Sequence, residues 1–280
     1  MRKWTPPIGD VSCAAAVEPV IHPVRKTAND QVSSTTALAP RPNQKRRPSF
    51  NQANPASYNW GEYDLLISNS EGGLESLRAL GARRAEVVFW GADPEFFAPQ
   101  PVEKETDVFF YGYGDKFRRE WMASLVGEPS RALPDVDFSL GGHDFRGDTG
   151  NARLAGDVPF PSFPRAISAA RINLCITRRS HATVPASSSC RPFELAATGA
   201  AIVANPYEGI ERWFEPGSEL LVVNDADEAV AAYQALLDDP AQAEEMGRRA
   251  RERVLDEHTY RHRARRVLEL LDLGVTAHVH

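Results

Sequence analysis

The chain has 280 residues, of which 42% are hydrophobic and 25% are charged, and its formal net charge is −6. This length can build one large or two ordinary domains with a full hydrophobic core. The first 50 residues are basic whereas the remainder is acidic, and an acidic body argues against a nucleic-acid-binding surface. We therefore expect no nucleic-acid partner. Because no apolar run reaches the length of a membrane span, we also expect no transmembrane segment.

Cysteine usage indicates the compartment. Cys13, Cys175 and Cys190 have neither the number for a disulfide framework nor the spacing of a metal site, which is typical of a reducing cytoplasm. The acidic triplets 135–137 and 225–227 match a pattern too common to identify a cation site, and the second has the character of a helix start capped by aspartate. We expect a cytoplasmic protein that binds no metal.

The N-terminal segment, residues 1–57, is rich in proline and polar residues and has no sustained apolar periodicity. Such a segment cannot bury enough apolar surface to offset the entropy of ordering, so we expect a disordered tail. Its basic run at 45–47 is typical of a solvated tail.

Ordered structure is expected to begin at residue 58 with a strand, a helix and a second strand, followed by a proline-marked linker near residue 99. From residue 107 onward, strand and helix patterns alternate, which predicts an α/β fold with a doubly wound parallel sheet. The expected strands are 64–68, 86–90, 108–111, 137–140, 172–176, 200–204 and 220–223, and the expected helices are 71–80, 117–126, 163–170, 192–198, 226–237, 240–257 and 260–271.

Residues 186–205 carry the clearest chemical signal. A loop of small residues with three serines leads into Arg191, Glu194 and a buried strand. The serines are expected to cap a helix whose first N–H groups carry partial positive charge, and Arg191 adds planar donors suited to two phosphate oxygens. Glu194, one turn further on, can accept two hydrogen bonds from a vicinal diol such as that of a ribose. This stretch predicts nucleotide-sugar binding.

A glycine-containing turn, residues 112–114, follows an expected strand and precedes an expected helix. Acidic residues follow at the spacing of a Rossmann dinucleotide fingerprint, but Phe117 stands where a third glycine permits close helix packing. We therefore rank a nicotinamide-dependent oxidoreductase below a protein that binds a nucleotide sugar. The turn at Gly112 can still approach a phosphate, with Lys116 or Arg118 supplying charge, or it is a plain strand-to-helix turn.

The histidines do not identify a catalytic base. His143 follows a strand end, where open α/β sheets bind ligands, but spacing identifies no partner for it. His181 lies in a polar segment that we expect to be flexible. A charged His258 near a helix end would favour the helix dipole. The catalytic residues are left unassigned.

Three blocks in the C-terminal half resemble the spore-maturation-protein-type glycosyltransferases, which have the GT-B fold. The blocks are residues 190–200, 214–219 and 257–263, and the upstream stretches 64–69, 91–93 and 97–99 are similar to the same family's crossing between its two domains. The resemblance covers the chain from about residue 60 to residue 271.

The resemblance implies an enzyme that binds a nucleoside-diphosphate sugar mainly through its C-terminal domain and transfers the sugar to an acceptor held by the N-terminal one. Such enzymes usually need no metal or other cofactor, because a helix dipole and basic side chains stabilise the departing diphosphate. Here Arg191 and the start of its helix would hold the diphosphate with help from Ser189, and Glu194 would bind the ribose. Gly112 and Lys116 are expected to belong to the same donor site.

The expected organisation has four parts. Residues 1–57 form the tail, 58–98 a remnant of the N-terminal GT-B domain, 99–258 the Rossmann-like nucleotide-sugar-binding domain, and 259–280 a C-terminal helix and tail. A complete N-terminal domain needs roughly 100 to 150 residues, so most of the acceptor-side machinery is not evident. In related families a second glutamate stands before Glu194, at the position of Ala186, which puts the donor-sugar contact in question.

Two hypotheses follow. The first is a metal-independent GT-B glycosyltransferase that acts on an unidentified acceptor. The alternative is a non-catalytic nucleotide-binding or assembly module derived from a truncated glycosyltransferase. A short N-terminal domain would expose a sheet edge and apolar surface, from which we expect a protein partner or self-association.

Overall fold

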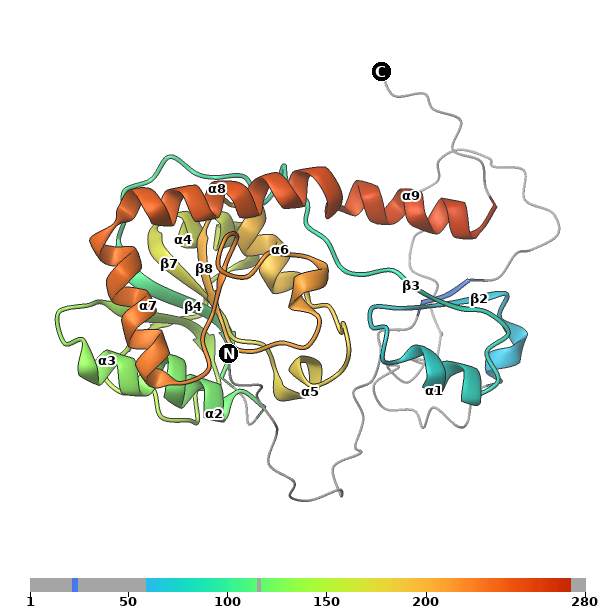
Figure 1. Ribbon diagram of the computed structural model, residues 1–280, viewed down its shortest axis with the longest axis horizontal. Coiled ribbons are helices and arrows are strands. Elements are labelled where there is room, and N and C mark those ends of the chain that lie inside the picture. Colours follow the sequence, from blue (N-terminus) through green and yellow to red (C-terminus); the bar gives the residue numbers. More distant parts are fainter. Residues whose placement is uncertain (1–21, 25–58, 115–116, 273–280) are drawn as a thin grey trace, which may run out of the picture.

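The computed structural model describes residues 22–24, 59–114 and 117–272. Within these ranges the chain forms a small unit with a three-stranded sheet and a larger unit with a six-stranded sheet (Figure 1). The predicted α/β fold, with a parallel sheet preceded by a short α/β unit, is confirmed.

The small unit is built around β2 (Leu65–Ser68), whose four residues are all buried. A 3₁₀ turn (Trp60–Glu62) precedes it, and α1 (Leu74–Ala79) connects it to β3 (Ala85–Val87), which pairs with it in parallel. On the other side of β2 runs β1 (His22–Val24), in antiparallel pairing. Residues 22–24 belong to the segment that was expected to form a disordered tail, and here they pair with the edge of β2. The remainder of residues 1–58 lies outside the described residues.

The larger unit contains a parallel sheet whose strand order, within the described residues, is β6-β5-β4-β7-β8-β9. Strand β6 was not predicted, because all four of its residues are exposed at the sheet edge and show no buried alternation. The strand bounds are β4 Thr106–Tyr113, β5 Phe138–His143, β6 Arg153–Gly156, β7 Ala170–Cys175, β8 Ala201–Ala204 and β9 Leu221–Val222.

Helices cover both faces of this sheet. Strand β4 shows the division, since Val108 and Phe110 pack with one cluster of helices and Phe109 and Tyr111 with the other. The first cluster includes α2 (Arg119–Met122), a π-helical turn (Ala123–Gly127), the residue that directly follows α3 (Glu128–Ala132), and α7 (Ala226–Asp238). The second includes α4 (Phe163–Ser168), α6 (Cys190–Ala197) and the C-terminal half of α8 (Pro240–Glu257). Two 3₁₀ turns (Phe160–Ser162, Ile210–Arg212) and the short α5 (Arg179–Ala182) lie in connections.

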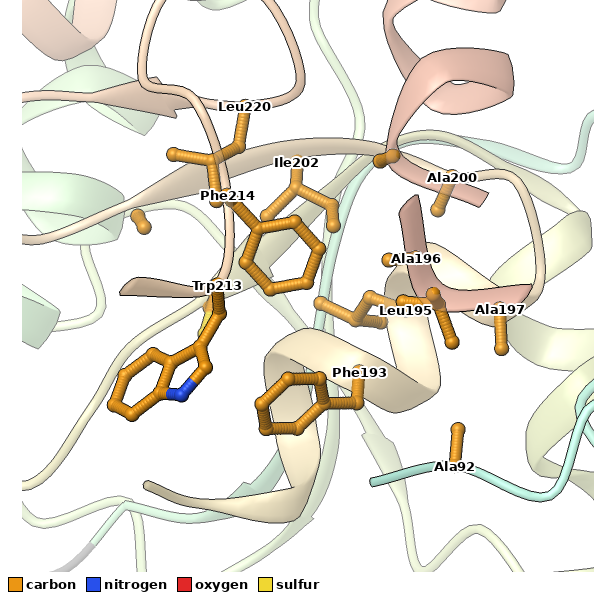
Figure 2. Packing of buried hydrophobic residues seen from close by; sticks show 14 of the residues in the cluster. Ala92, Phe193, Leu195, Ala196, Ala197, Ala200, Ile202, Trp213, Phe214 and Leu220 are labelled. Atoms are coloured by element: carbon orange, nitrogen blue, oxygen red, sulfur yellow. The ribbon is translucent and has the colours of Figure 1, made fainter. Parts of the chain in front are cut away.

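Helix α6 is anchored firmly in the core. Phe193 is fully buried, and its ring lies 5.9 Å from that of Trp213 and 5.7 Å from that of Phe214, centroid to centroid (Figure 2). The α8 backbone approaches the end of α6 so closely that a Cβ at Gly247 would lie 2.1 Å from the carbonyl oxygen of Gly199. The orientation of α6 is thus set by packing on several sides.

Helix α9 (Tyr260–Leu270) joins the two units, because it continues from α8 and reaches across to the small unit (Figure 1). It buries Leu270 against Leu65 and Ile67, and Val267 packs there as well. Leu268, the next residue of the helix, is 37% exposed. On the other face of β2, Leu66 packs against Trp60 and against Leu77 of α1. Both faces of the small sheet are therefore covered.

His258, at the end of α8, is buried. Its Nε2 lies 3.2 Å from the carbonyl oxygen of Trp213, and its Nδ1 lies 2.8 Å from the Arg263 guanidinium. Burial, assisted by the Arg263 charge, lowers the pKa of His258 to about 4. The ring is therefore neutral at pH 7, and the expectation that its charge favours the helix dipole is wrong.

Candidate functional site

The expected donor residues meet at the carboxyl edge of the large sheet, where α6 begins. Ser189 is the N-cap of α6, but in the described part of the chain its hydroxyl caps no N–H group of the helix. Ser187 and Ser188 are buried, and their hydroxyls lie 3.0 Å from His181 Nδ1 and 2.9 Å from Asn69 O, respectively. The prediction that the serines cap the helix is therefore wrong. Within the described ranges, no N-cap side chain binds the first-turn N–H groups of α6, which suits them to an anion.

Arg191 lies across the aromatic ring of Tyr111. Its guanidinium carbon is 3.1 Å from the centroid of Tyr111 and 5.9 Å from that of Phe163. The Nη1 atom is buried and has no hydrogen-bond partner among the described residues. Burial lowers the pKa of Arg191 to about 10, against the opposing charge of Glu194, so the side chain remains a cation at neutral pH. A buried cation with an unsatisfied donor favours an anionic ligand.

Glu194 faces Arg191 from the next turn of α6. Its Oε2 lies 3.6 Å from Arg191 Nη1 and accepts a hydrogen bond from the Tyr111 hydroxyl at 3.0 Å. Burial raises the pKa of Glu194, and the Arg191 charge counteracts this rise. One carboxylate oxygen of Glu194 is thus engaged within the protein.

The turn after β4 completes this cluster. Gly112 has φ +143°, a value that side chains rarely adopt, and a Cβ there would lie 3.9 Å from Arg191 Nη2. The absent side chain lets a ligand approach the backbone beside the guanidinium. The structure therefore brings Ser189, Arg191, Glu194 and Gly112 to one edge of the sheet. Lys116, the remaining expected donor contact, lies outside the described residues.

Two neighbours of this turn differ from expectation. Phe117 is 46% exposed and α2 begins only at Arg119, so Phe117 does not obstruct close helix packing as the sequence argument assumed. Arg118 donates hydrogen bonds to Ile176 O at 2.7 Å and Tyr113 O at 2.9 Å. It therefore ties the end of β4 to the end of β7.

His143 has a partner that the sequence did not reveal. Its Nδ1 lies 2.7 Å from Asp157 Oδ1, and its ring packs edge-on against Tyr113 with centroids 4.3 Å apart. Asp157 comes from the connection after the unpredicted strand β6, so sequence spacing contained no signal for this pair. The pair is exposed and lies beside the β4 turn.

Cys190 is a packing residue. Burial raises the pKa of its thiol to about 11, and its Sγ lies 3.9 Å from the Tyr260 hydroxyl. A thiol with so high a pKa is not a thiolate at neutral pH, so this environment does not favour a reactive cysteine.

Tyr111 is the member of the site that sequence reasoning missed. The strand pattern identified it only as a buried position, whereas its ring supports Arg191 and its hydroxyl binds Glu194. The useful signal was strand alternation, which places position 111 on the same face as α6.

We expect Tyr111→Phe to weaken nucleotide binding about threefold to tenfold, because it keeps the ring under Arg191 but removes one hydrogen bond to Glu194. Calorimetric titration measures this change. Tyr233→Phe is the matched control, since the Tyr233 hydroxyl is also buried and donates to Leu125 O at 2.8 Å in the cluster on the other face of the sheet. An equal loss of affinity in both variants would contradict the assignment.

Among the described residues, neither acidic triplet belongs to a group of side chains that could hold a metal ion. Asp225 caps α7, accepting from the Glu228 N–H at 2.9 Å as predicted, and Asp137 pairs with Arg153 at 3.2 Å. Over the described ranges, no group of three His, Cys, Asp or Glu side chains is placed to hold a metal. No helix within those ranges combines the length and apolarity of a membrane span.

Comparison with known proteins identifies relatives of this arrangement. A model of the "Glycosyl transferase-like" family matches residues 118–269, which is more than half of the chain. No curated protein matches the chain.

Among solved structures, sucrose-phosphate synthase from Thermosynechococcus elongatus superposes with a TM-score of 0.59 at 18% identity, over 75% of this chain and 58% of that one. Anabaena HepE in complex with UDP and glucose has a TM-score of 0.61 at 14% identity, over 78% of this chain and 68% of that one. The T4 phage β-glucosyltransferase has a TM-score of 0.53 at 16% identity, over 71% of this chain and 61% of that one. The chain thus spans less than two thirds of the length of the synthase, and these similarities confirm the predicted fold.

Proposed function

Because this chain belongs to the glycosyl transferase-like family, we propose that it binds a nucleoside-diphosphate sugar at the start of α6 and transfers the sugar to an acceptor. The observation that carries the proposal is Arg191, a largely buried cation that lies between Glu194 and the Gly112 turn and whose Nη1 has no hydrogen-bond partner among the described residues. The UDP present in the HepE structure supports a nucleoside diphosphate as the ligand class.

In the proposed mechanism the protein stabilises the departing diphosphate. Negative charge grows on the phosphate oxygens as the bond to the sugar breaks, and a fixed cation at a helix start binds that charge more strongly than the charge of the ground state. Arg191 supplies the cation, and the first N–H groups of α6 with Ser189 supply hydrogen-bond donors. We propose that Glu194 binds the ribose diol and that no metal is required.

The alternative, a non-catalytic nucleotide-binding module, is favoured by one observation. The loop after β2 packs directly against the segment that leads into α6, through a bridge between Ser70 and Ser187. In this alternative the contact serves to hold the two units together, and no acceptor enters between them. The two functions are separated by assaying sugar transfer and slow donor hydrolysis once a donor has been identified.

The test of the donor site is calorimetric titration of the full chain with UDP, GDP, their sugar conjugates and NAD. We expect selective binding of one nucleoside diphosphate, weakened by roughly 1–3 kcal/mol in Glu194→Ala because the carboxylate's hydrogen bonds are lost. Glu219→Ala is the matched control, since Glu219 is also buried and pairs with Arg253 at 3.1 Å but is no part of the site. If the folded protein binds no nucleotide, or if both variants lose equal affinity, the proposal fails.

A further inference from the structure

A loop of the small unit holds the segment that leads into α6. Asn69 directly follows β2, and Ser188 directly precedes the N-cap of α6. The side-chain Nδ2 of Asn69 donates to Ser188 O at 2.9 Å, and the backbone N–H of Ser188 donates to Asn69 O at 2.9 Å. The two residues, which are far apart in sequence, are therefore joined by reciprocal hydrogen bonds.

Ser188 is held by a third residue as well. Its hydroxyl donates to Asn69 O at 2.9 Å and accepts from the backbone N–H of Trp90 at 3.0 Å. Ser188 is 0% and Asn69 5% exposed, so water does not readily replace a lost partner. Removing one of these bonds leaves a buried polar group unpaired.

The segment before α6 does not hold its own conformation. Ala186 has φ +43°, a left-handed value that costs a non-glycine residue on the order of 1–3 kcal/mol and persists only where surrounding contacts enforce it. The hydroxyl of Ser189 caps no N–H group within the described residues. The first turn of α6 is therefore positioned by tertiary contacts, and the Asn69–Ser188 pair lies one residue before its N-cap.

We propose that Asn69 is a positioning residue for the nucleotide site, acting through Ser188 without touching the nucleotide. The proposal rests on the proposed function. Releasing Ser188 displaces Ser189 and the first N–H groups of α6 relative to Arg191, and an anion site depends on the convergence of these donors. The small unit thus contributes to donor binding from outside the site.

The experiment compares variants of the full chain by calorimetric titration with the nucleoside diphosphate that the wild type binds. Asn69→Ala removes the amide, and Asn69→Asp keeps its shape but replaces the donor by an acceptor facing Ser188 O. We expect a fivefold to tenfold loss of affinity, or roughly one hydrogen bond, in both variants. Ser70→Ala is the control, because Ser70 Oγ donates to Pro185 O at 3.2 Å and so joins the same two segments farther from α6. We expect that control to change the affinity less than about twofold.

A purely structural role for Asn69 has a different signature. It would lower the unfolding midpoint of Asn69→Ala while leaving affinity unchanged at temperatures where the variant is folded, and this result overturns the proposal. If Asn69→Ala does not fold, the isosteric Asn69→Asp decides by the same criterion. Wild-type binding that survives in the Asn69 variants overturns this proposal alone, whereas absence of nucleotide binding by the wild type overturns the proposed function and this proposal with it.

Discussion

Gly142→Ala is expected to lower the free energy of unfolding by about 3 kcal/mol or more, since it combines backbone strain with a backbone clash. Gly142 has φ +114° and lies opposite Gly112 in the parallel pairing of β5 with β4. A Cβ at this position would lie 2.0 Å from the carbonyl oxygen of Gly112. The two strand ends must therefore separate, which also moves the turn beside Arg191, and nucleotide affinity should fall with stability.

Gly217→Ala is the control that separates the cost of backbone strain from the cost of a steric clash. Gly217 also has a left-handed φ, +89°, but among the described residues no heavy atom outside Gly217 and its two chain neighbours lies within 4 Å of the Cβ that alanine would add. We expect this control to cost only about 1 kcal/mol. Denaturant unfolding followed by tryptophan fluorescence measures both variants. If both variants lose the same free energy of unfolding, the two strand ends can separate without cost. This result would contradict the prediction.

Acidification is expected to remove about 3 kcal/mol of stability through His258. In the unfolded chain this histidine has a pKa of about 6.5, whereas burial and the Arg263 charge hold its folded-state pKa at about 4. Below pH 6.5 the unfolded state therefore binds the proton first. The contribution of the neutral His258 to the free energy of unfolding is fully present above pH 6.5, declines as the pH falls, and is lost by about pH 4.

The variant that tests this is His258→Gln, whose amide can donate to Trp213 O in place of Nε2–H but does not titrate. The charged groups around the ring are Arg263, Arg253, His262 and Glu257, and all of them are retained. Unfolding is measured from pH 7 to pH 4 for both proteins, so that the other titrating groups cancel in the difference. The wild type should lose more stability than the variant over this range, and parallel curves would contradict the assignment.

His258 and Arg263 matter because they connect the units on which the site depends. Arg263 donates to Trp90 O at 2.9 Å as well as to His258, and its guanidinium lies 5.8 Å from the ring of Phe193 in α6. Ala92, just beyond Trp90, forms a backbone bridge with Thr259. Helix α6, the segment that follows β3 and the start of α9 are thus held by one set of contacts, which supports the proposal that the small unit stabilises the donor site.

Local patterns predicted much of the fold because each reports burial along one element. The alternation in β4, β7 and β8 reflects two covered faces, and the α6 region was identified from its small residues, charged pair and following strand. Strand β6 and helix α5 were missed, since β6 is fully exposed and α5 is only four residues long. Strand β1 was missed because its order comes from pairing with β2.

The sequence by itself determined the α/β class, the order of the main strands and helices, and Arg191 and Glu194 as the candidate site, because spacing within one element specifies these. Only the tertiary structure decided that Tyr111 supports Arg191 and binds Glu194, that Asp157 partners His143, and that Asn69 holds the entrance of α6. It also decided that the serines before α6 do not cap it. Each of these contacts joins segments distant in the chain, and such pairs are created by the packing of whole elements rather than by the preferences of neighbouring residues.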